Sequence, residues 1–155
     1  MRCGKRWHAR DVLVPDSPTL VVLDTGVVIG ALGNRRGLPA RVLLFVVESG
    51  VGLVSDQLTA EYRSALISPR PTRHHGLGRA AVQEFVESFV SLAREAVPSP
   101  GPDCPDRRDQ HLWDLLATER QAILVTGEAA LLDSNHFPGR ILSPRDFVER
   151  YLDAD

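Results

Sequence analysis

The chain has 155 residues, of which 43% are hydrophobic and 25% are charged. This is the balance of an ordinary globular domain that is long enough to bury its own hydrophobic core. The formal net charge of −2 excludes a strong basic field over the whole molecule, so any contact with nucleic acid would have to come from a local patch.

Cysteine usage and the N-terminal composition bear on location and domain organisation. Cys3 and Cys104 lie far apart and form no CxxC pair, which favours two free thiols in a reducing compartment. No apolar run approaches the ~18 residues of a membrane span. The polar, basic residues 1–18 precede no apolar segment of signal-peptide type. We therefore expect a cytoplasmic protein with a polar extension over residues 1–18 and a single domain over residues 19–155.

The first elements of the domain alternate strand and helix patterns. Residues 20–23 form a continuous apolar run that predicts a buried, parallel strand. Residues 27–32 and 38–48 predict two helices, the second with Pro39 in its first turn, where proline is tolerated. Residues 51–54 then predict a short strand.

The middle of the chain is dominated by helical patterns. Ser55 is placed to cap a helix whose apolar face runs to Leu66. The prolines in residues 69–71 predict a break in the chain. Residues 80–96 carry the longest helical pattern, and residues 98–102 predict a turn-rich linker.

The last third continues the alternation. The predicted elements are a helix, a strand, a short helix and a strand over residues 109–119, 123–125, 129–132 and 140–142. Trp113 is expected in the core, and Ser143 is expected to cap a final helix that begins at Pro144. The whole order predicts an α/β fold with a parallel sheet and helices on both of its faces.

Acidic residues recur where the predicted strands end. Asp24 directly follows the first strand, Glu61 lies in the helix after the second, and Glu128 follows the third. Asp106 and Asp109 stand at the start of the helix that leads to the third strand. Because the carboxyl ends of parallel strands meet at one edge of a sheet, we expect these five side chains to converge.

Such a convergence predicts a metal site. Two carboxylates ~4 Å apart repel each other by roughly 4 kcal/mol at an effective dielectric constant near 20, and a divalent cation would remove that cost. Oxygen ligands select Mg²⁺ or Mn²⁺, which can activate water and hold a phosphodiester. Taken singly, Asp106 and Glu61 have ordinary explanations as a helix-terminal charge and a solvated side chain. Asp24 ends a buried run, where a carboxylate needs a partner or a cation.

Five segments resemble the characteristic motifs of the PIN-domain family, in the same order. They are VVLDTGVVI, SDQLTAE, CPDRRDQHL, ILVTGEAALL and ILSPRDF, at residues 21–29, 55–61, 104–112, 123–132 and 141–147. The resemblance extends over residues 19–152 and is closest to the bacterial members described as toxins of toxin–antitoxin pairs. It implies a PIN-like three-layer α/β/α fold with a central, mostly parallel sheet of four to five strands.

The resemblance also implies a function and a set of site residues. It points to a ribonuclease that hydrolyses RNA phosphodiester bonds with a water activated by Mg²⁺ or Mn²⁺. Carried over position by position, the catalytic and metal-binding acids would be Asp24, Glu61, Asp109 and Glu128. Asp106 competes with Asp109 for the third of these positions. Thr25 and Thr126 would support the site.

Two departures from the family pattern leave an alternative open. Gly26 stands where the family usually has asparagine, a residue that could anchor the loop around Asp24. Glu128 stands where aspartate is usual, and metal sites are sensitive to such a displacement of a carboxylate. The alternative is a catalytically weak PIN fold that binds RNA or a protein. A phosphatase with Asp24 as its nucleophile is disfavoured, because no second aspartate follows two residues later.

The expected partners are RNA and an antitoxin. Arg35, Arg36 and Arg73 fall in or near predicted loops and are candidates for contacts with the phosphate backbone. A free ribonuclease endangers its host, so an antitoxin is expected to cover the acidic pocket, with an arginine inserted among the carboxylates. The helix predicted over residues 80–96 is a candidate surface for a homodimer or another partner.

Overall fold

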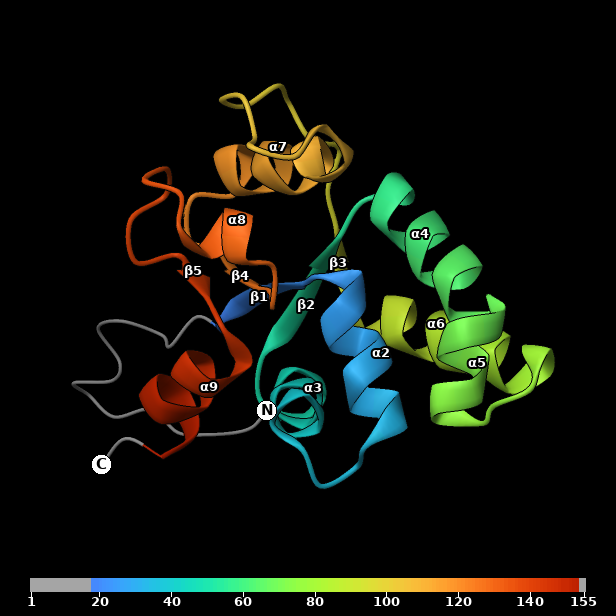
Figure 1. Ribbon diagram of the computed structural model, residues 1–155. Coiled ribbons are helices and arrows are strands. Elements are labelled where there is room, and N and C mark those ends of the chain that lie inside the picture. Colours follow the sequence, from blue (N-terminus) through green and yellow to red (C-terminus); the bar gives the residue numbers. More distant parts are fainter. Residues whose placement is uncertain (1–17, 154–155) are drawn as a thin grey trace.

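A parallel sheet forms the centre of the molecule. The computed structural model describes residues 18–153, and within them five strands form one sheet in the order β3-β2-β1-β4-β5 (Figure 1). The strands are β1 (Leu20–Leu23), β2 (Val51–Val54), β3 (Arg94–Glu95), β4 (Ile123–Val125) and β5 (Ile141–Leu142). The predicted sheet of four to five strands is therefore confirmed, and every pair of neighbouring strands runs parallel.

Helices cover both faces of this sheet, which confirms the three-layer α/β/α arrangement. They are α2 (Thr25–Gly33), α3 (Leu38–Glu48), α4 (Asp56–Leu66), α5 (Pro69–His75), α6 (Arg79–Leu92), α7 (Gln110–Thr118), α8 (Ala129–Leu132) and α9 (Pro144–Phe147). A 3-10 turn, η1 (Arg107–Asp109), precedes α7, and a π-helical turn, η2 (Val148–Leu152), follows α9. In Figure 1, α3 and α9 lie together below the sheet, whereas α7 lies above it and contacts α4.

The helix caps follow from the local sequence. The Ser55 hydroxyl accepts a hydrogen bond from the backbone N–H of Leu58 at 3.1 Å, and the Ser143 hydroxyl accepts one from the N–H of Asp146 at 3.1 Å. Each serine satisfies an N–H group that has no partner within its helix. Both predicted caps are confirmed, and they fix where α4 and α9 leave the carboxyl ends of β2 and β5.

The helix predicted over residues 80–96 is wrong at its C-terminal end. α6 ends at Leu92, and Ala93 already has extended backbone. Arg94 and Glu95 form β3, in parallel register with Leu53 and its neighbour in β2. The side chains of this two-residue strand are both exposed, so it has no apolar pattern from which a strand could be predicted.

The chain break predicted at residues 69–71 lies just before these residues, because α4 ends at Leu66 and residues 69–71 are themselves helical. Pro69 begins α5 and Pro71 lies in its first turn, where the missing N–H has no intrahelical partner to lose. Gly76 ends the helix with a left-handed φ of 71°, the conformation that glycine adopts without a steric cost. Arg73 therefore lies in the last turn of a helix and not in a loop.

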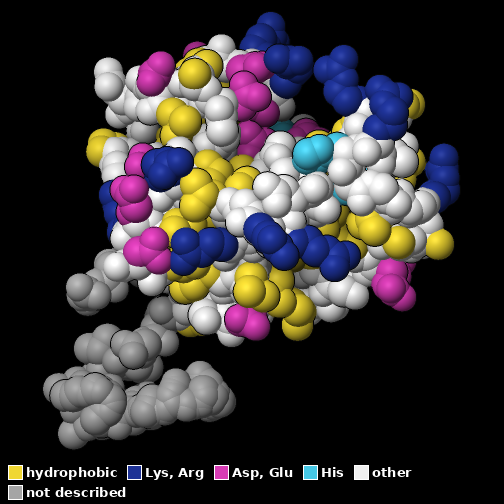
Figure 2. Space-filling view, turned by 60° about the horizontal axis from the view of Figure 1, so that its bottom comes forward, with side chains coloured by type: hydrophobic (Ala, Val, Ile, Leu, Met, Phe, Trp, Pro, Cys, Tyr) yellow, Lys and Arg dark blue, Asp and Glu magenta, His cyan; other side chains and the backbone are white. Residues whose placement is uncertain are grey.

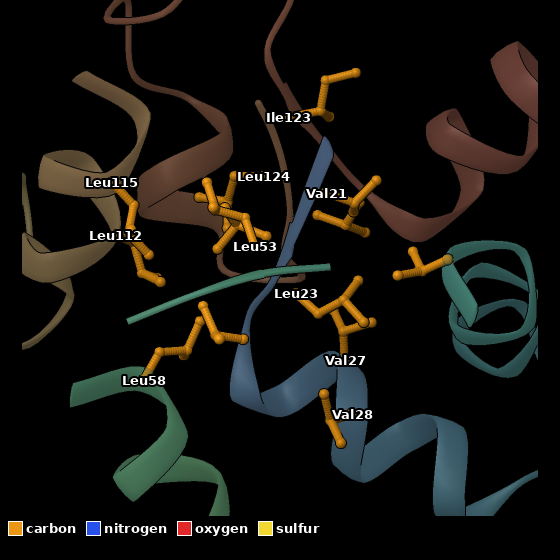
Figure 3. Packing of buried hydrophobic residues seen from close by; sticks show 14 of the residues in the cluster. Val21, Leu23, Val27, Val28, Leu53, Leu58, Leu112, Leu115, Ile123 and Leu124 are labelled. Atoms are coloured by element: carbon orange, nitrogen blue, oxygen red, sulfur yellow. The ribbon is translucent and has the colours of Figure 1, made fainter. Parts of the chain in front are cut away.

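The core is built around β1, whose four residues are all buried. Figure 3 shows Val21 and Leu23 of this strand on one side of the sheet, whereas Leu53 of β2 and Leu124 of β4 lie on the other side. Trp113 of α7 has no exposed surface, and its ring meets the ring of Phe137 edge-on at a centroid distance of 5.5 Å. The predicted core position of Trp113 is thus confirmed.

The predicted extension over residues 1–18 lies outside the described residues, apart from Pro18. That extension and the domain boundary at residue 19 stay predictions, as does the state of Cys3. Cys104 is a buried free thiol. Within residues 18–153, no helix combines the length and apolar character needed to cross a membrane.

Candidate functional site

The carboxyl ends of β1 and β4 bring Asp24 and Thr126 together. These residues directly follow two strands that pair in parallel, with Leu23 beside Val125. The Asp24 N–H donates to the Val125 carbonyl at 3.0 Å, and the Thr126 hydroxyl donates to Asp24 Oδ2 at 2.6 Å. Thr126 Oγ1 also accepts a hydrogen bond from the N–H of Glu128 at 3.0 Å. Thr126 therefore orients one acid and the loop that carries another.

Glu61 reaches the same edge of the sheet from α4. The Thr25 hydroxyl donates to Glu61 Oε1 at 2.7 Å, and His111 Nε2 lies 3.2 Å from Glu61 Oε2. Because a carboxylate only accepts hydrogen bonds, His111 carries a proton on Nε2 in this arrangement. The neighbouring Tyr62 donates its hydroxyl to the Leu23 carbonyl at 2.6 Å, which ties α4 to the end of β1.

Asp106 and Asp109 belong to the turn before α7. Asp106 Oδ1 accepts a hydrogen bond from the N–H of Arg108 at 2.9 Å, and Arg108 Nη2 donates to Asp106 Oδ2 at 3.0 Å. The Arg108 side chain is 90% exposed, so this ion pair contributes little to stability. The positive charge of Arg108 nevertheless neutralises the negative charge of Asp106. Of the two aspartates, Asp109 is therefore the better candidate for the third metal-binding acid.

All five predicted acids line one pocket of about 300 Å³. Its walls are Asp24, Thr25, Gly26, Glu61, Asp106, Arg108, Asp109 and Glu128. Figure 2 shows acidic side chains gathered beside a hollow near the upper edge of the molecule, with basic side chains above them. The predicted convergence is thus found. As the side chains stand, however, no three Asp, Glu, His or Cys residues within 18–153 form a group that could hold a metal ion.

Burial and mutual repulsion disfavour negative charge in this pocket. Burial is the main cause that raises the pKa of Asp24; the charges of Glu128 and Glu61 add to it, and the hydrogen bond from Thr126 opposes it. Burial also raises the pKa of Asp109 to about 6, with a further rise from the neighbouring carboxylates. A divalent cation would relieve both effects.

The donor atoms fit a hard divalent cation, although some are already engaged. The candidate ligands are carboxylate oxygens, which Mg²⁺ and Mn²⁺ prefer. Both Glu61 oxygens accept hydrogen bonds, from Thr25 and His111, and Asp106 is paired with Arg108. Each carboxylate has about four lone-pair sites, so these bonds leave acceptor capacity that a cation could use.

Comparison with known proteins identifies the family. The family model described as "PIN domain" matches residues 20–130, which is more than half of the chain and includes every acid of the pocket. The chain belongs to the PIN domain family. It is also similar to the uncharacterized protein MJ1680 of Methanocaldococcus jannaschii, with 26% identity over 141 residues that cover 84% of this chain and 90% of that protein. PIN domains are generally nucleases, so the family supports a nuclease fold for this chain.

The three arginines predicted to bind RNA lie away from the acidic pocket of this PIN domain. Arg35 and Arg36 are exposed after the C-terminal end of α2, whereas Thr25, at the other end, lines the pocket. α2 has nine residues, which corresponds to about 13 Å. Arg73 is exposed on α5, which contacts α2. Their contact with RNA stays a prediction, and Arg108 is the basic residue that lines the pocket itself.

His111 is the site residue that the sequence patterns missed. It is 4% exposed, and its Nδ1 has no hydrogen-bond partner within residues 18–153. A histidine on the buried face of α7, beside Leu112 and Leu115, was the available signal, because a buried polar side chain requires a partner. The partner, Glu61, is 50 residues away in the sequence.

We expect His111→Leu to weaken Mn²⁺ binding about 10–100-fold, the usual cost of losing a residue that orients a metal ligand. Leucine removes the donor that holds Glu61 Oε2. His111→Gln should bind Mn²⁺ much more tightly than His111→Leu, because a glutamine N–H can occupy the place of Nε2. Isothermal titration calorimetry measures both affinities. Equal affinities for the two variants would show that His111 only fills space.

The raised pKa of Asp109 predicts a pH-dependent stability for the metal-free PIN domain. The folded state binds this proton more tightly, with a pKa of about 6 against the ordinary value of 3.8, so ionisation of Asp109 opposes folding as pH rises through that window. Asp109→Asn should therefore gain stability over the parent between about pH 4 and 6, and the gain should level off above. Urea denaturation in EDTA measures the difference, and a difference that does not change with pH would contradict the prediction.

Proposed function

We propose that this PIN domain is a ribonuclease that hydrolyses RNA phosphodiester bonds and depends on Mg²⁺ or Mn²⁺. The observation that supports this most strongly is the single pocket lined by five acids, two of which have a pKa raised mainly by burial. Without a cation this pocket would repel a phosphodiester. With one, it has the charge and the oxygen donors that phosphoryl chemistry uses.

The residues of the pocket divide into ligands and residues that position them. The acids that would hold the cation are Asp24, Glu61, Asp109 and Glu128, with Asp106 beside them. A bound Mg²⁺ or Mn²⁺ supplies a Lewis acid that polarises a phosphoryl oxygen and makes a water molecule more acidic. Thr126 keeps Asp24 oriented, and Thr25 and His111 hold Glu61 from opposite sides. Such outer contacts tune the ligands of a metal.

Arg108 is the basic group best placed to meet the substrate at the pocket. Its guanidinium lies on the rim of the acidic pocket, is largely exposed and is paired with Asp106 at 3.0 Å. A guanidinium binds phosphate with two parallel hydrogen bonds. A phosphate of the RNA could therefore replace Asp106 as the partner of Arg108. Neither side chain of this ion pair is fully buried, so separating the two leaves no buried charge without a partner.

The resemblance to PIN toxins extends the proposal to a partner. A ribonuclease that is harmful to its host requires an antitoxin, and the acidic pocket is the surface that such a partner would cover. An arginine of the partner would satisfy the same carboxylates as the cation. A homodimer through α6 is a separate prediction, and the exposed Leu92 at the end of this helix is compatible with it.

A catalytically weak PIN fold that binds RNA or a protein is the alternative. It is favoured by the engagement of both Glu61 oxygens and by the lack of a complete metal-holding group within residues 18–153. In this alternative the protein would not cleave RNA even at high concentrations of divalent cation.

Cleavage of a labelled structured RNA in EDTA, Mg²⁺ or Mn²⁺ decides between these functions. We expect cutting with at least one metal and none in EDTA. Hydrolysis by water leaves no 2′,3′-cyclic phosphate on the products, which separates it from contaminating ribonucleases that use the 2′-hydroxyl. Folded protein that binds the RNA but does not cut it with either metal would contradict the proposal and favour the alternative.

A further inference from the structure

A second hollow adjoins the acidic pocket. It has a volume of about 280 Å³ and shares Asp24, Gly26 and Glu128 with that pocket. Its other walls are Val27, Pro39, Gly127 and Pro144. The two hollows meet at the shared residues, so a ligand held in one can extend over Gly26 into the other.

The walls of this second hollow favour a flat, uncharged ligand. Val27 and the rings of Pro39 and Pro144 are apolar, and among the described residues that line it only Asp24 and Glu128 carry charge. Within residues 18–153, no basic side chain lines this hollow, so it offers the phosphates of a nucleic acid no counter-charge of its own. A nucleobase has a flat face that packs on apolar surface, and such packing depends little on base identity.

Gly26 keeps the passage between the hollows open. A Cβ atom built there would meet no atom within 4 Å among the described residues, and the backbone does not have the positive φ that would demand glycine. The position lies in the first turn of α2, where most other residues have a better helix propensity. The local backbone therefore does not require glycine, and any larger side chain would occupy the passage.

We propose that the second hollow binds the base of the nucleotide next to the scissile phosphate, while that phosphate lies in the acidic pocket. This inference rests on the proposed ribonuclease function and adds a substrate subsite to it. The base packs mainly on the rings of Pro39 and Pro144, because Val27 is only 3% exposed, and the strand crosses the surface at Gly26. The protein thus binds one unstacked nucleotide, which favours single-stranded loops over duplex RNA as the substrate.

A cycle of protein and substrate changes tests this subsite. The substrates are RNAs that differ by one abasic nucleotide at successive positions around the cleaved bond. For the parent protein, loss of the base at one position should raise KM about tenfold, because the apolar surface that the base buries in the hollow is lost. Gly26→Leu should raise KM for intact RNA by a similar factor, and the abasic position should then cost nothing further, because the leucine already fills the passage.

Two measurements distinguish a misfolded Gly26→Leu protein from a folded one that has lost the subsite. Gly26→Leu should raise the midpoint of thermal unfolding, because leucine is a far better helix former than glycine. Gly78→Leu is the matched control: its side chain also enters open space, but at the N-cap of α6, and its KM should equal that of the parent.

The outcomes separate the two proposals. A parent protein that cuts no RNA would overturn the ribonuclease function, and this subsite with it. If the RNA is cut but no abasic position changes KM, the subsite alone is overturned. The subsite is also overturned if the abasic nucleotide raises KM by the same factor in Gly26→Leu as in the parent. Cleavage with one sensitive position that Gly26→Leu makes insensitive would support both.

Discussion

Asp24→Asn is expected to reduce RNA cleavage at least ~10³-fold and yet leave the metal-free protein no less stable. A cation in such a site contributes several kcal/mol to the transition state, and each 1.36 kcal/mol is about tenfold in rate. Asparagine lacks the charge that holds the cation. It keeps a carbonyl oxygen that can accept the hydrogen bond from Thr126, which reaches Asp24 Oδ2 at 2.6 Å in the parent.

The stability half of this prediction follows from the sign of the pKa shift. Burial raises the pKa of Asp24, so the folded state binds this proton more tightly than the unfolded state, and ionisation of Asp24 opposes folding. A neutral amide removes that opposition, and urea denaturation in EDTA should give an unfolding free energy equal to or above that of the parent. Asp133→Asn, an exposed position at the end of α8, is the matched control and should cut RNA normally. A large loss of stability in Asp24→Asn would mean that the carboxylate has a structural role.

Trp113→Ala is expected to lower the unfolding free energy by about 3–5 kcal/mol, the usual cost of removing a buried aromatic side chain. Trp113 has no exposed surface and contacts Phe137 edge-on. The residue belongs to α7, the helix that also carries His111. Urea denaturation measures the loss, and cleavage should fall at temperatures where the variant unfolds.

Trp113→Phe is the control for this change. Phenylalanine leaves a smaller cavity and also removes an indole N–H that finds no hydrogen-bond partner in the described part of the chain. An unsatisfied buried donor is itself destabilising, so the phenylalanine variant should lose less than half of what the alanine variant loses. A Trp113→Ala protein as stable as the parent would be incompatible with the packing between α7 and the sheet.

The strands that could be predicted are those buried on both faces of the sheet. A parallel strand covered by helices is a continuous apolar run, and β1, β2 and β4 have such runs, so their positions follow from the sequence. The strand predicted over residues 140–142 is also found, as β5. β3 could not be predicted, because Arg94 and Glu95 are exposed and pair with β2 through the backbone alone. α5 was hidden by Pro69 and Pro71, since a proline in the first turn of a helix looks like one that breaks it.

The acids of the site were predictable, but their hydrogen-bond partners were not. Asp24 and Glu128 stand at strand ends, and the topology of a parallel sheet brings strand ends together. The bond from His111 to Glu61 joins helices 50 residues apart in the chain, and no periodic pattern encodes such a contact. Gly26 could be recognised as unusual, but only the space around it shows that it joins two hollows.

The hydrogen bond between Thr126 and Asp24 joins residues 102 positions apart, which has a consequence for how the protein is made. Chains fold from the N-terminus as they are synthesised, and β1 and α4 emerge from the ribosome long before β4. The acidic pocket lacks Glu128, and the hydroxyl that orients Asp24, until β4 and the loop after it have been translated. Under the proposed ribonuclease function, a nascent chain would therefore lack a complete site for most of the time that it is being made.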